Sequence, residues 1–206
     1  VVIINIIRQN NWSVEGYHKS SIFFERGKGS YLFAGKKKFI DLSYCAGTLI
    51  LGHNSSVFKK SLQLVSKNNI SNFANTNIHA VNFSKTIKKI IPHYSKLIFC
   101  NSGTESVMRS FRVCRAITNK KKIISVTGSW HGSVDDTLYY PDQNFRPKKI
   151  SDGLGYGTKK NIIFIPYNDE KLSKKILNIH RNKISCVIIE PIQASLPLEN
   201  SKKYLK

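Results

Sequence analysis

The sequence predicts an α/β fold, a largely parallel sheet with flanking helices, preceded by a small N-terminal antiparallel segment. Two observations predict it. Short, unbroken apolar runs recur in the second half of the chain, and helical patterns separate them, which is typical of strands buried on both faces of a covered parallel sheet. The N-terminal part instead clusters β-prone residues around glycines, which indicates hairpins.

The N-terminal elements follow in order. Residues 20–43, "SSIFFERGKGSYLFAGKKKFIDLS", predict a short antiparallel meander with glycines at its turns. Residues 55–67 place apolar side chains at loosely helical spacing behind a serine cap, and residues 79–91 repeat the pattern before Pro92. Both stretches are predicted helices.

The second half supplies the predicted parallel sheet. Its strands are expected at 97–100 ("LIFC"), 122–126 ("KIISV"), 161–165 ("NIIFI") and 185–190 ("SCVIIE"), with helices at 104–118 and 169–180. The Gly-, Pro- and Lys-rich stretch 141–160 is predicted to be a long functional or mobile loop.

We assign residues 1–66 to an N-terminal segment and residues 67–206 to the first part of a larger, incomplete α/β domain. The chain starts at Val1 rather than Met, and its final "SKKYLK" reads as the middle of a helix. We therefore expect a truncated piece of a longer protein.

Composition narrows the class of protein. Of the 206 residues, 41% are hydrophobic, which can supply a core, but no apolar run approaches the roughly 20 residues that span a bilayer. The opening "VVIINII" is too short for a signal peptide and has no basic lead or cleavage site. We expect a soluble, cytoplasmic protein without a membrane partner.

The net charge of +21 raises the question of a nucleic-acid partner. The lysines, however, fall in short runs scattered along the chain, Arg is scarce beside Lys, and no run is interleaved with aromatic residues. We expect no specific nucleic-acid binding. The four cysteines are widely spaced without a C-x-x-C pair, which favours reduced core thiols over disulfides or a metal site.

The stretch "LIFCNSGTESVMRSF" delivers an apolar run into an expected helix through small polar residues. The exposed N–H groups and positive dipole of a helix start favour anions, and Ser102, Gly103 and Thr104 suit a phosphate. Alternatively, Ser102 and Glu105 form a capping box that only closes the helix end. Spacing alone leaves both interpretations open.

A second stretch, "VTGSWHGS", presents Trp130 and His131 on a glycine-flanked turn after the next predicted strand. The carboxyl ends of parallel strands share one edge, so this turn is expected beside Ser102, where a planar phosphorylated cofactor could bind. Trp130 could equally be a half-buried aromatic, and His131 a turn residue. Glu190 follows the last strand at the same edge, either positioning a cation or pairing with a lysine.

These blocks resemble the class III aminotransferases, pyridoxal-phosphate enzymes of fold type I, and among them most closely the glutamate-1-semialdehyde 2,1-aminomutases. The similar stretches are "FFERGKGSYLF", "TLILGHN", "FCNSGTESVMRSFRVCRAIT", "VTGSWHG", "IPYND" and "VIIEPI". The resemblance implies pyridoxal 5'-phosphate as cofactor, with Ser102, Gly103 and Thr104 at its phosphate. It also implies that Trp130 stacks on the ring and that His131 supports the turn.

The substrate side would carry Glu190, Gln193 and Ser195. Gln193 looks more like the ordinary transaminases of the class, and Ser195 replaces an Asn or Glu, so the type of reaction stays open. The turn Ala34-Gly35-Lys36 replaces the usual Asp before "FID". The Asp that pairs with the pyridine nitrogen and the Lys that holds the cofactor covalently belong beyond "IIEPI" in the family, so no catalytic residue is assigned in this chain.

The resemblance implies amino-group transfer on a small amino or keto substrate by a homodimer of the full-length protein, most like the conversion of glutamate 1-semialdehyde into 5-aminolevulinate. This piece alone is expected to be inactive. An ω-type or sugar-modifying transaminase is the alternative within the class, and a noncatalytic remnant or basic binding module is the alternative outside it.

Overall fold

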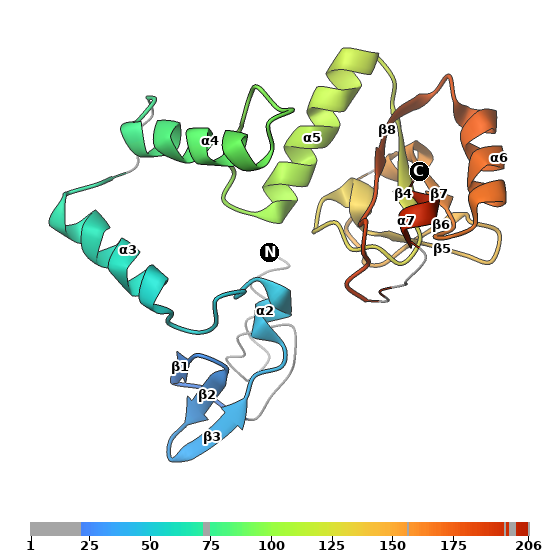
Figure 1. Cartoon of the computed structure of the whole chain (residues 1–206). Helices are drawn as coiled ribbons and strands as arrows, with labels where there is room; N and C mark the ends of the chain where they lie inside the picture. The colour runs from blue at the N-terminus through green and yellow to red at the C-terminus, as the bar shows by residue number, and fades with distance from the viewer. Residues whose placement is uncertain (1–21, 72–74, 156, 196, 198–200, 206) are drawn as a thin grey trace, which may run out of the picture. The chain divides into compact units, whose positions relative to one another are not determined.

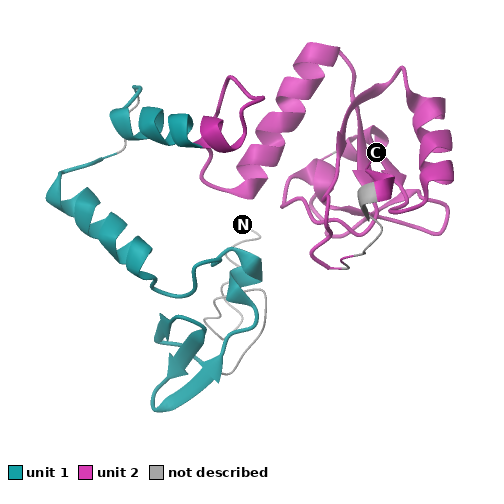
Figure 2. Ribbon diagram, in the orientation of Figure 1, with its two compact units in different colours: residues 1–86 teal, residues 87–206 magenta. Residues whose placement is uncertain are grey.

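The computed structural model describes residues 22–71, 75–155, 157–195, 197 and 201–205 (Figure 1). The chain divides into two compact units, residues 1–86 and 87–206 (Figure 2). The domain boundary predicted after residue 66 stays a prediction. The apolar opening lies outside the described residues.

Unit 1 contains the predicted meander. Strands β1 (Arg26–Lys28), β2 (Tyr31–Ala34) and β3 (Lys37–Ile40) form an antiparallel sheet in that order. Ala34 pairs with Lys37 across a two-residue turn, in which Gly35 takes the left-handed φ of 55° that such turns require. The Ala34-Gly35-Lys36 departure from the family pattern is thus a hairpin turn.

A polar cluster ties this sheet to the turn at Gly52 and His53. His53 Nε2 lies 2.6 Å from Asp41 Oδ2, and the other carboxylate oxygen accepts from the backbone of Ser43 (2.9 Å) and Tyr44 (3.1 Å). The hydrogen bond from His53, with these backbone bonds, lowers the pKa of Asp41. The backbones of Gly29 and His53 also exchange two hydrogen bonds of 2.9 Å.

Three helical elements follow: α2 (Tyr44–Gly47), α3 (Ser56–Lys67) and α4 (Ile78–Ile90), the last running across the boundary between the units. The two predicted helices are confirmed as α3 and α4. The Ser55 hydroxyl caps α3 by accepting from Phe58 N–H at 3.2 Å. Neither α3 nor α4 contains a buried residue.

Unit 2 holds the parallel sheet, with strand order β7-β4-β8. Its elements are α5 (Gly103–Thr118), β4 (Lys122–Val126), β7 (Ile162–Ile165), α6 (Glu170–His180) and β8 (Ile184–Ile188). Phe111 of α5 packs on Ile123 of β4, whereas α6 packs on Ile124 and Val126 of the same strand. The two helices therefore cover opposite faces, as the unbroken apolar runs predict (Figure 1).

Two predictions about the sheet are wrong. Residues 97–100 form no strand, and Ile98 is 64% exposed. A strand needs a neighbour for its hydrogen bonds, and the described sheet has β7 and β8 at its edges instead. Strand β8 is also not buried on both faces, because Val187 on this edge is 47% exposed.

The stretch 141–160 is only partly a loop. Strands β5 (Tyr139–Pro141) and β6 (Pro147–Lys149) pair antiparallel, and a 3-10 turn, η2 (Thr158–Asn161), leads into β7. A further 3-10 turn, η1 (Asp135–Thr137), precedes β5, and α7 (Ser201–Tyr204) lies near the end of the chain.

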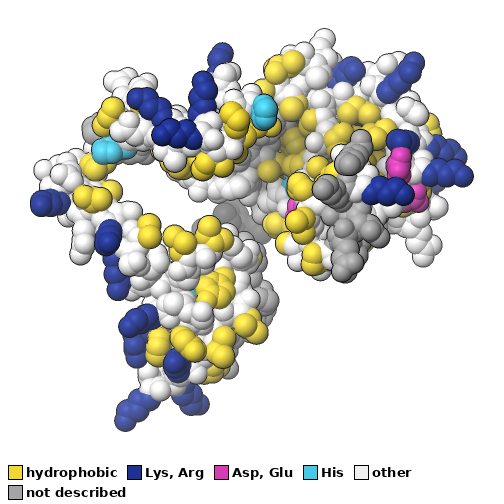
Figure 3. All heavy atoms as spheres, in the orientation of Figure 1, with side chains coloured by type: hydrophobic (Ala, Val, Ile, Leu, Met, Phe, Trp, Pro, Cys, Tyr) yellow, Lys and Arg dark blue, Asp and Glu magenta, His cyan; other side chains and the backbone are white. Residues whose placement is uncertain are grey.

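The four cysteines are free thiols; Cys45 is exposed and the other three are half-buried, so their placement in the core is only partly right. Burial is the main cause that raises the pKa of Cys186, to about 11. Lys and Arg side chains are scattered over the visible face rather than gathered in one patch (Figure 3). None of the helices in the described part of the chain is long and apolar enough to cross a membrane.

Candidate cofactor site at the carboxyl edge of the sheet

The start of α5 forms the predicted capping contacts. Ser102 has an extended backbone, and its hydroxyl oxygen accepts from Glu105 N–H at 3.1 Å. Glu105 Oε2 in turn accepts from Asn101 N–H at 2.7 Å, one residue earlier than in the usual capping box. These two bonds stabilise the helix end without any ligand.

The same helix start keeps capacity for an anion. Among the described residues, the N–H groups of Gly103 and Thr104 have no hydrogen-bond acceptor, and the Ser102 hydroxyl proton is not used by the cap. A side chain at Gly103 would meet nothing within 4 Å, so this position faces open space. Capping and phosphate binding are therefore compatible, and the sequence alternatives do not exclude each other.

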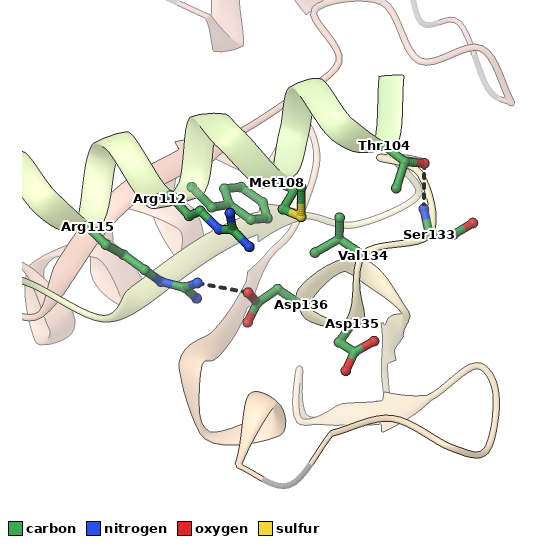
Figure 4. A pocket seen from close by; sticks show the side chains of 9 residues that line it. Thr104, Met108, Arg112, Arg115, Ser133, Val134, Asp135 and Asp136 are labelled. Atoms are coloured by element: carbon green, nitrogen blue, oxygen red, sulfur yellow. Dashed lines mark hydrogen bonds and ion pairs between the residues drawn. The ribbon is translucent and has the colours of Figure 1, made fainter. Parts of the chain in front are cut away.

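The turn that carries Trp130 and His131 packs directly against this helix start. Thr104 Oγ1 accepts from Ser133 N–H at 3.1 Å (Figure 4). Gly132 has a φ of 83°, and a Cβ there would lie 2.6 Å from Thr104 Oγ1, so only glycine allows this approach. These contacts bring the two stretches together, as predicted. They do not involve the Trp130 ring, so its stacking on a cofactor stays a prediction.

Trp130 and His131 differ in their surroundings. Trp130 is 57% exposed, and its backbone N–H donates to Glu190 Oε1 at 2.8 Å. His131 is half-buried, and its Nε2 is buried without a hydrogen-bond partner among the described residues. Burial lowers the pKa of His131, and the negative charge of Glu190 opposes this shift. The Trp130 side chain is thus available for contact, whereas burial in the turn disfavours the charged form of His131.

The loop after β8 contacts the turn through three side chains. Gln193 is 2% exposed and donates to Thr127 O at 2.6 Å and Ser129 Oγ at 3.0 Å. Ser195 Oγ donates to Gly128 O at 2.9 Å.

Glu190 accepts hydrogen bonds from both the turn at Trp130 and the loop after β8. Besides the bond from Trp130, its other oxygen accepts from Ala194 N–H at 2.9 Å. Within the described residues Glu190 forms no ion pair with lysine. The predicted substrate-side role of Glu190, Gln193 and Ser195 stays a prediction, because their observed contacts are with the protein itself.

A third loop, after β7, completes the edge and was missed from the sequence. Tyr167 N–H donates to Thr127 Oγ1 at 3.2 Å, and the Tyr167 hydroxyl donates to Pro191 O at 3.0 Å. Thr127 and Tyr167 stand one and two residues beyond their strands, as Glu190 does beyond β8, and this position was the available signal.

A pocket of about 450 Å³ runs along α5 from Thr104 and was also missed (Figure 4). Arg115 Nη1 lies 2.9 Å from Asp136 Oδ2 at its far end. This ion pair fixes the segment after the turn to α5. The two acidic and two basic side chains in its lining, Asp135, Asp136, Arg112 and Arg115, balance, so the pocket does not favour an anion.

Comparison with known proteins agrees with this geometry. The sequence pattern of the family described as "Aminotransferase class-III" matches residues 13–196. The glutamate-1-semialdehyde 2,1-aminomutase of Wigglesworthia glossinidia brevipalpis is 33% identical over 180 residues, which cover 85% of this chain and 41% of that protein. The chain thus spans less than half the length of this curated relative.

Solved structures share the fold. An omega-transaminase from Sphaerobacter thermophilus superposes with a TM-score of 0.78 at 22% identity, covering 89% of this chain and 44% of that one. A structure titled "Transaminase with PLP bound" gives the same TM-score of 0.78 at 24% identity, covering 89% and 45%. With the family pattern matching most of its length, the chain belongs to the class III aminotransferases, a family of pyridoxal-phosphate enzymes.

Proposed function

We propose that the start of α5 and the turn 127–133 bind pyridoxal 5'-phosphate. Ser102, Gly103 and Thr104 hold the phosphate, Trp130 stacks on the pyridine ring, and His131 supports the turn. The observation that carries this proposal is the contact of Thr104 with Ser133 and Gly132, because it brings an anion-binding helix start and an exposed indole to one edge.

The residues present fit both ends of this cofactor. Two unpaired N–H groups, two hydroxyls and the positive helix end suit a phosphate dianion, and the exposed aromatic ring suits a flat heterocycle. Hydrogen bonds to a charged group contribute about 1.5–3 kcal/mol each, against about 1 kcal/mol for a helix cap, so a bound phosphate dominates the energetics of this helix start.

When bound, the cofactor supplies an electron sink for charge that develops beside the substrate amine. The residues of this chain bind and orient it. Because the family's pyridine-pairing Asp and cofactor-linking Lys were expected beyond the "IIEPI" stretch, we expect the 206 residues by themselves to bind the cofactor phosphate without turnover.

For the complete protein we propose amino-group transfer of the glutamate-1-semialdehyde 2,1-aminomutase type, from glutamate 1-semialdehyde to 5-aminolevulinate, by a cytoplasmic homodimer. The name of the 33% identical relative supports this choice. A class III transaminase of the ω or sugar-modifying type is the second candidate, which the likeness of Gln193 to the ordinary transaminases of the class favours. Turnover of glutamate 1-semialdehyde without an added amino acceptor separates the two.

Two serine caps provide a matched test of the site. Ser102 caps α5 and Ser55 caps α3 through the same contact, at 3.1 and 3.2 Å, but only Ser102 lies at the proposed phosphate. Ser102→Ala is expected to weaken pyridoxal 5'-phosphate and inorganic phosphate binding about tenfold or more, the value of one hydrogen bond to a charged group. Ser55→Ala should lower stability similarly and leave both affinities unchanged.

Fluorescence titration and phosphate competition measure these affinities. Equal losses for the two variants would remove the phosphate assignment, since capping alone would explain them. Tight, salt-sensitive RNA binding without phosphate affinity would instead favour a basic binding module.

A further inference from the structure

Loop 190–195 contacts every residue of turn 127–130 with a side-chain hydrogen bond. Gln193 binds Thr127 and Ser129, Ser195 binds Gly128, and Glu190 binds Trp130, over distances of 2.6 to 3.0 Å. The other half of the turn, at Gly132 and Ser133, rests on α5 instead. The turn is therefore held from two sides by different elements.

Gln193 is the buried centre of this arrangement. It is 2% exposed, and its Nε2 donates to two residues of the turn, so both of its amide protons are engaged. Gly128 has a φ of 84°, and a Cβ there would lie 3.0 Å from Gln193 Oε1. A residue with a side chain at 128 would be strained at this φ and would crowd the Gln193 amide, so glycine suits both the turn and this contact.

We propose that Gln193 is a positioning residue, which fixes the Trp130 ring at the cofactor edge by holding the Thr127 carbonyl and the Ser129 hydroxyl of the turn. The inference rests on the proposed function and deepens it. The resemblance to ordinary transaminases made Gln193 a guide to the type of reaction. As a positioning residue, this buried amide would act on the ring-stacking Trp130 rather than on the substrate, so it would no longer indicate the type of reaction. Among the described residues, no hydrogen bond joins Gln193 to the start of α5, so effects on ring orientation and on phosphate binding can be measured separately.

Gln193→Met tests the proposal, because it keeps side-chain length and removes both hydrogen bonds. The matched control is Gln143→Met, at an exposed residue between β5 and β6 that has no side-chain hydrogen bond among the described residues. Both are made in the complete protein. These 206 residues contain two tryptophans, so a background with Trp12→Phe, and with Phe at any tryptophan outside them, leaves Trp130 as the fluorescent reporter.

The first readout needs no cofactor. Gln193→Met is expected to lower the fluorescence anisotropy of Trp130 and to raise its quenching by acrylamide, while Gln143→Met changes neither. Unchanged anisotropy and quenching in Gln193→Met would overturn the proposal. If the protein binds no pyridoxal 5'-phosphate, the proposed function fails, but this readout still decides whether Gln193 positions the ring.

The second readout uses the cofactor. Gln193→Met is expected to weaken pyridoxal 5'-phosphate binding about two- to tenfold, the range of an aromatic stacking contact, and to reduce the visible circular dichroism of the bound cofactor. Inorganic phosphate affinity should change less than about twofold, because substitutions that remove no shared contact usually have independent effects, and the phosphate is expected at the start of α5 rather than at Gln193.

A double-mutant cycle separates positioning from general support. In a Trp130→Ala background, Gln193→Met should have almost no further effect on cofactor affinity, whereas an equal loss with and without the indole would overturn the proposal. If Gln193→Met does not fold, Ser129→Ala replaces it, since it removes the hydroxyl that accepts from Gln193 and leaves Gln193 in place. It should lower Trp130 anisotropy in the same direction, and no change would again count against the proposal.

Discussion

The two units use apolar residues differently. In the described residues, all the buried hydrophobic side chains lie between Phe111 and Ile165, within unit 2. Unit 1 has similar patterns along α3 and α4, yet none of their apolar residues is buried and most are exposed, among them Val57 at 58%, Leu62 at 53% and Phe83 at 53%. Unit 1 holds its sheet through strand pairing and the Asp41–His53 cluster instead.

This difference shows what an apolar pattern can specify. Periodicity places apolar residues on one face of an element, and it does so equally well in both units. Whether that face becomes core depends on a second element arriving to cover it, as α5 and α6 cover β4. Exposed apolar surface of the kind seen on α3 marks contact surfaces in proteins.

The largest expected effect contrasts two strand isoleucines. Ile124 is fully buried in β4, and Ile40 of β3 is 66% exposed. Ile124→Ala should lower the free energy of unfolding by about 2–5 kcal/mol through lost burial and the cavity left behind, whereas Ile40→Ala should cost under about 1 kcal/mol. Urea unfolding of the complete protein measures both. A comparable cost at Ile40 would show that the complete protein covers this face of unit 1.

Most of unit 2 could be predicted because its signals are local. The runs at β4 and β7 and the helical spacing of α5 and α6 identify these elements within a residue or two. The strand predicted at 97–100 is absent because this apolar run has no neighbouring strand to pair with. An apolar run does not by itself specify a pairing partner. The predicted burial of both faces of β8 is wrong for a related reason, because the sequence of one strand does not show its place in the strand order.

The candidate site divides in the same way. Trp130 could be placed at the carboxyl edge because it follows the apolar run of β4. Placing Ser102 there relied on a strand at 97–100 that the structure does not contain, and the contact of Thr104 with Ser133 brings the start of α5 to the turn instead. The contacts of Gln193 and Tyr167 could not be predicted, because they join loops that lie 40 to 66 residues from the turn along the chain. Such contacts depend on how far each loop folds back, which no short motif determines.

An intermediate effect is expected at the polar cluster of unit 1. Asp41→Asn replaces the charge that accepts from His53, Ser43 and Tyr44, and the loss of charge-assisted bonds should cost about 1–3 kcal/mol locally. Hydrogen exchange should show faster exchange in β1–β3 and unchanged protection in β4. Because the folded pKa of Asp41 is lowered, its contribution is present above the ordinary value of 3.8 and is lost as pH falls through the folded pKa.

Equal loss of protection in β4 would contradict a stabilising effect of Asp41 that is confined to unit 1. Asp152→Asn is the matched control, since Asp152 is exposed and its carboxylate has no hydrogen bond among the described residues. It should leave exchange in both sheets unchanged.

The smallest effect is expected at His131. Its contribution to stability begins to change with pH nearer neutrality than the contribution of Asp41 in unit 1. Burial lowers the pKa of His131 below its ordinary 6.5, so the unfolded chain takes up this proton first as pH falls. Its contribution to stability is therefore complete above pH 6.5 and is lost as pH falls through the folded pKa. NMR titration of the ring should give a midpoint below 6.5, and Glu190→Gln should lower it further, because the opposing charge is removed. A midpoint at or above 6.5 would mean that burial in the turn does not disfavour the charged form of His131, and this account of its surroundings would no longer hold.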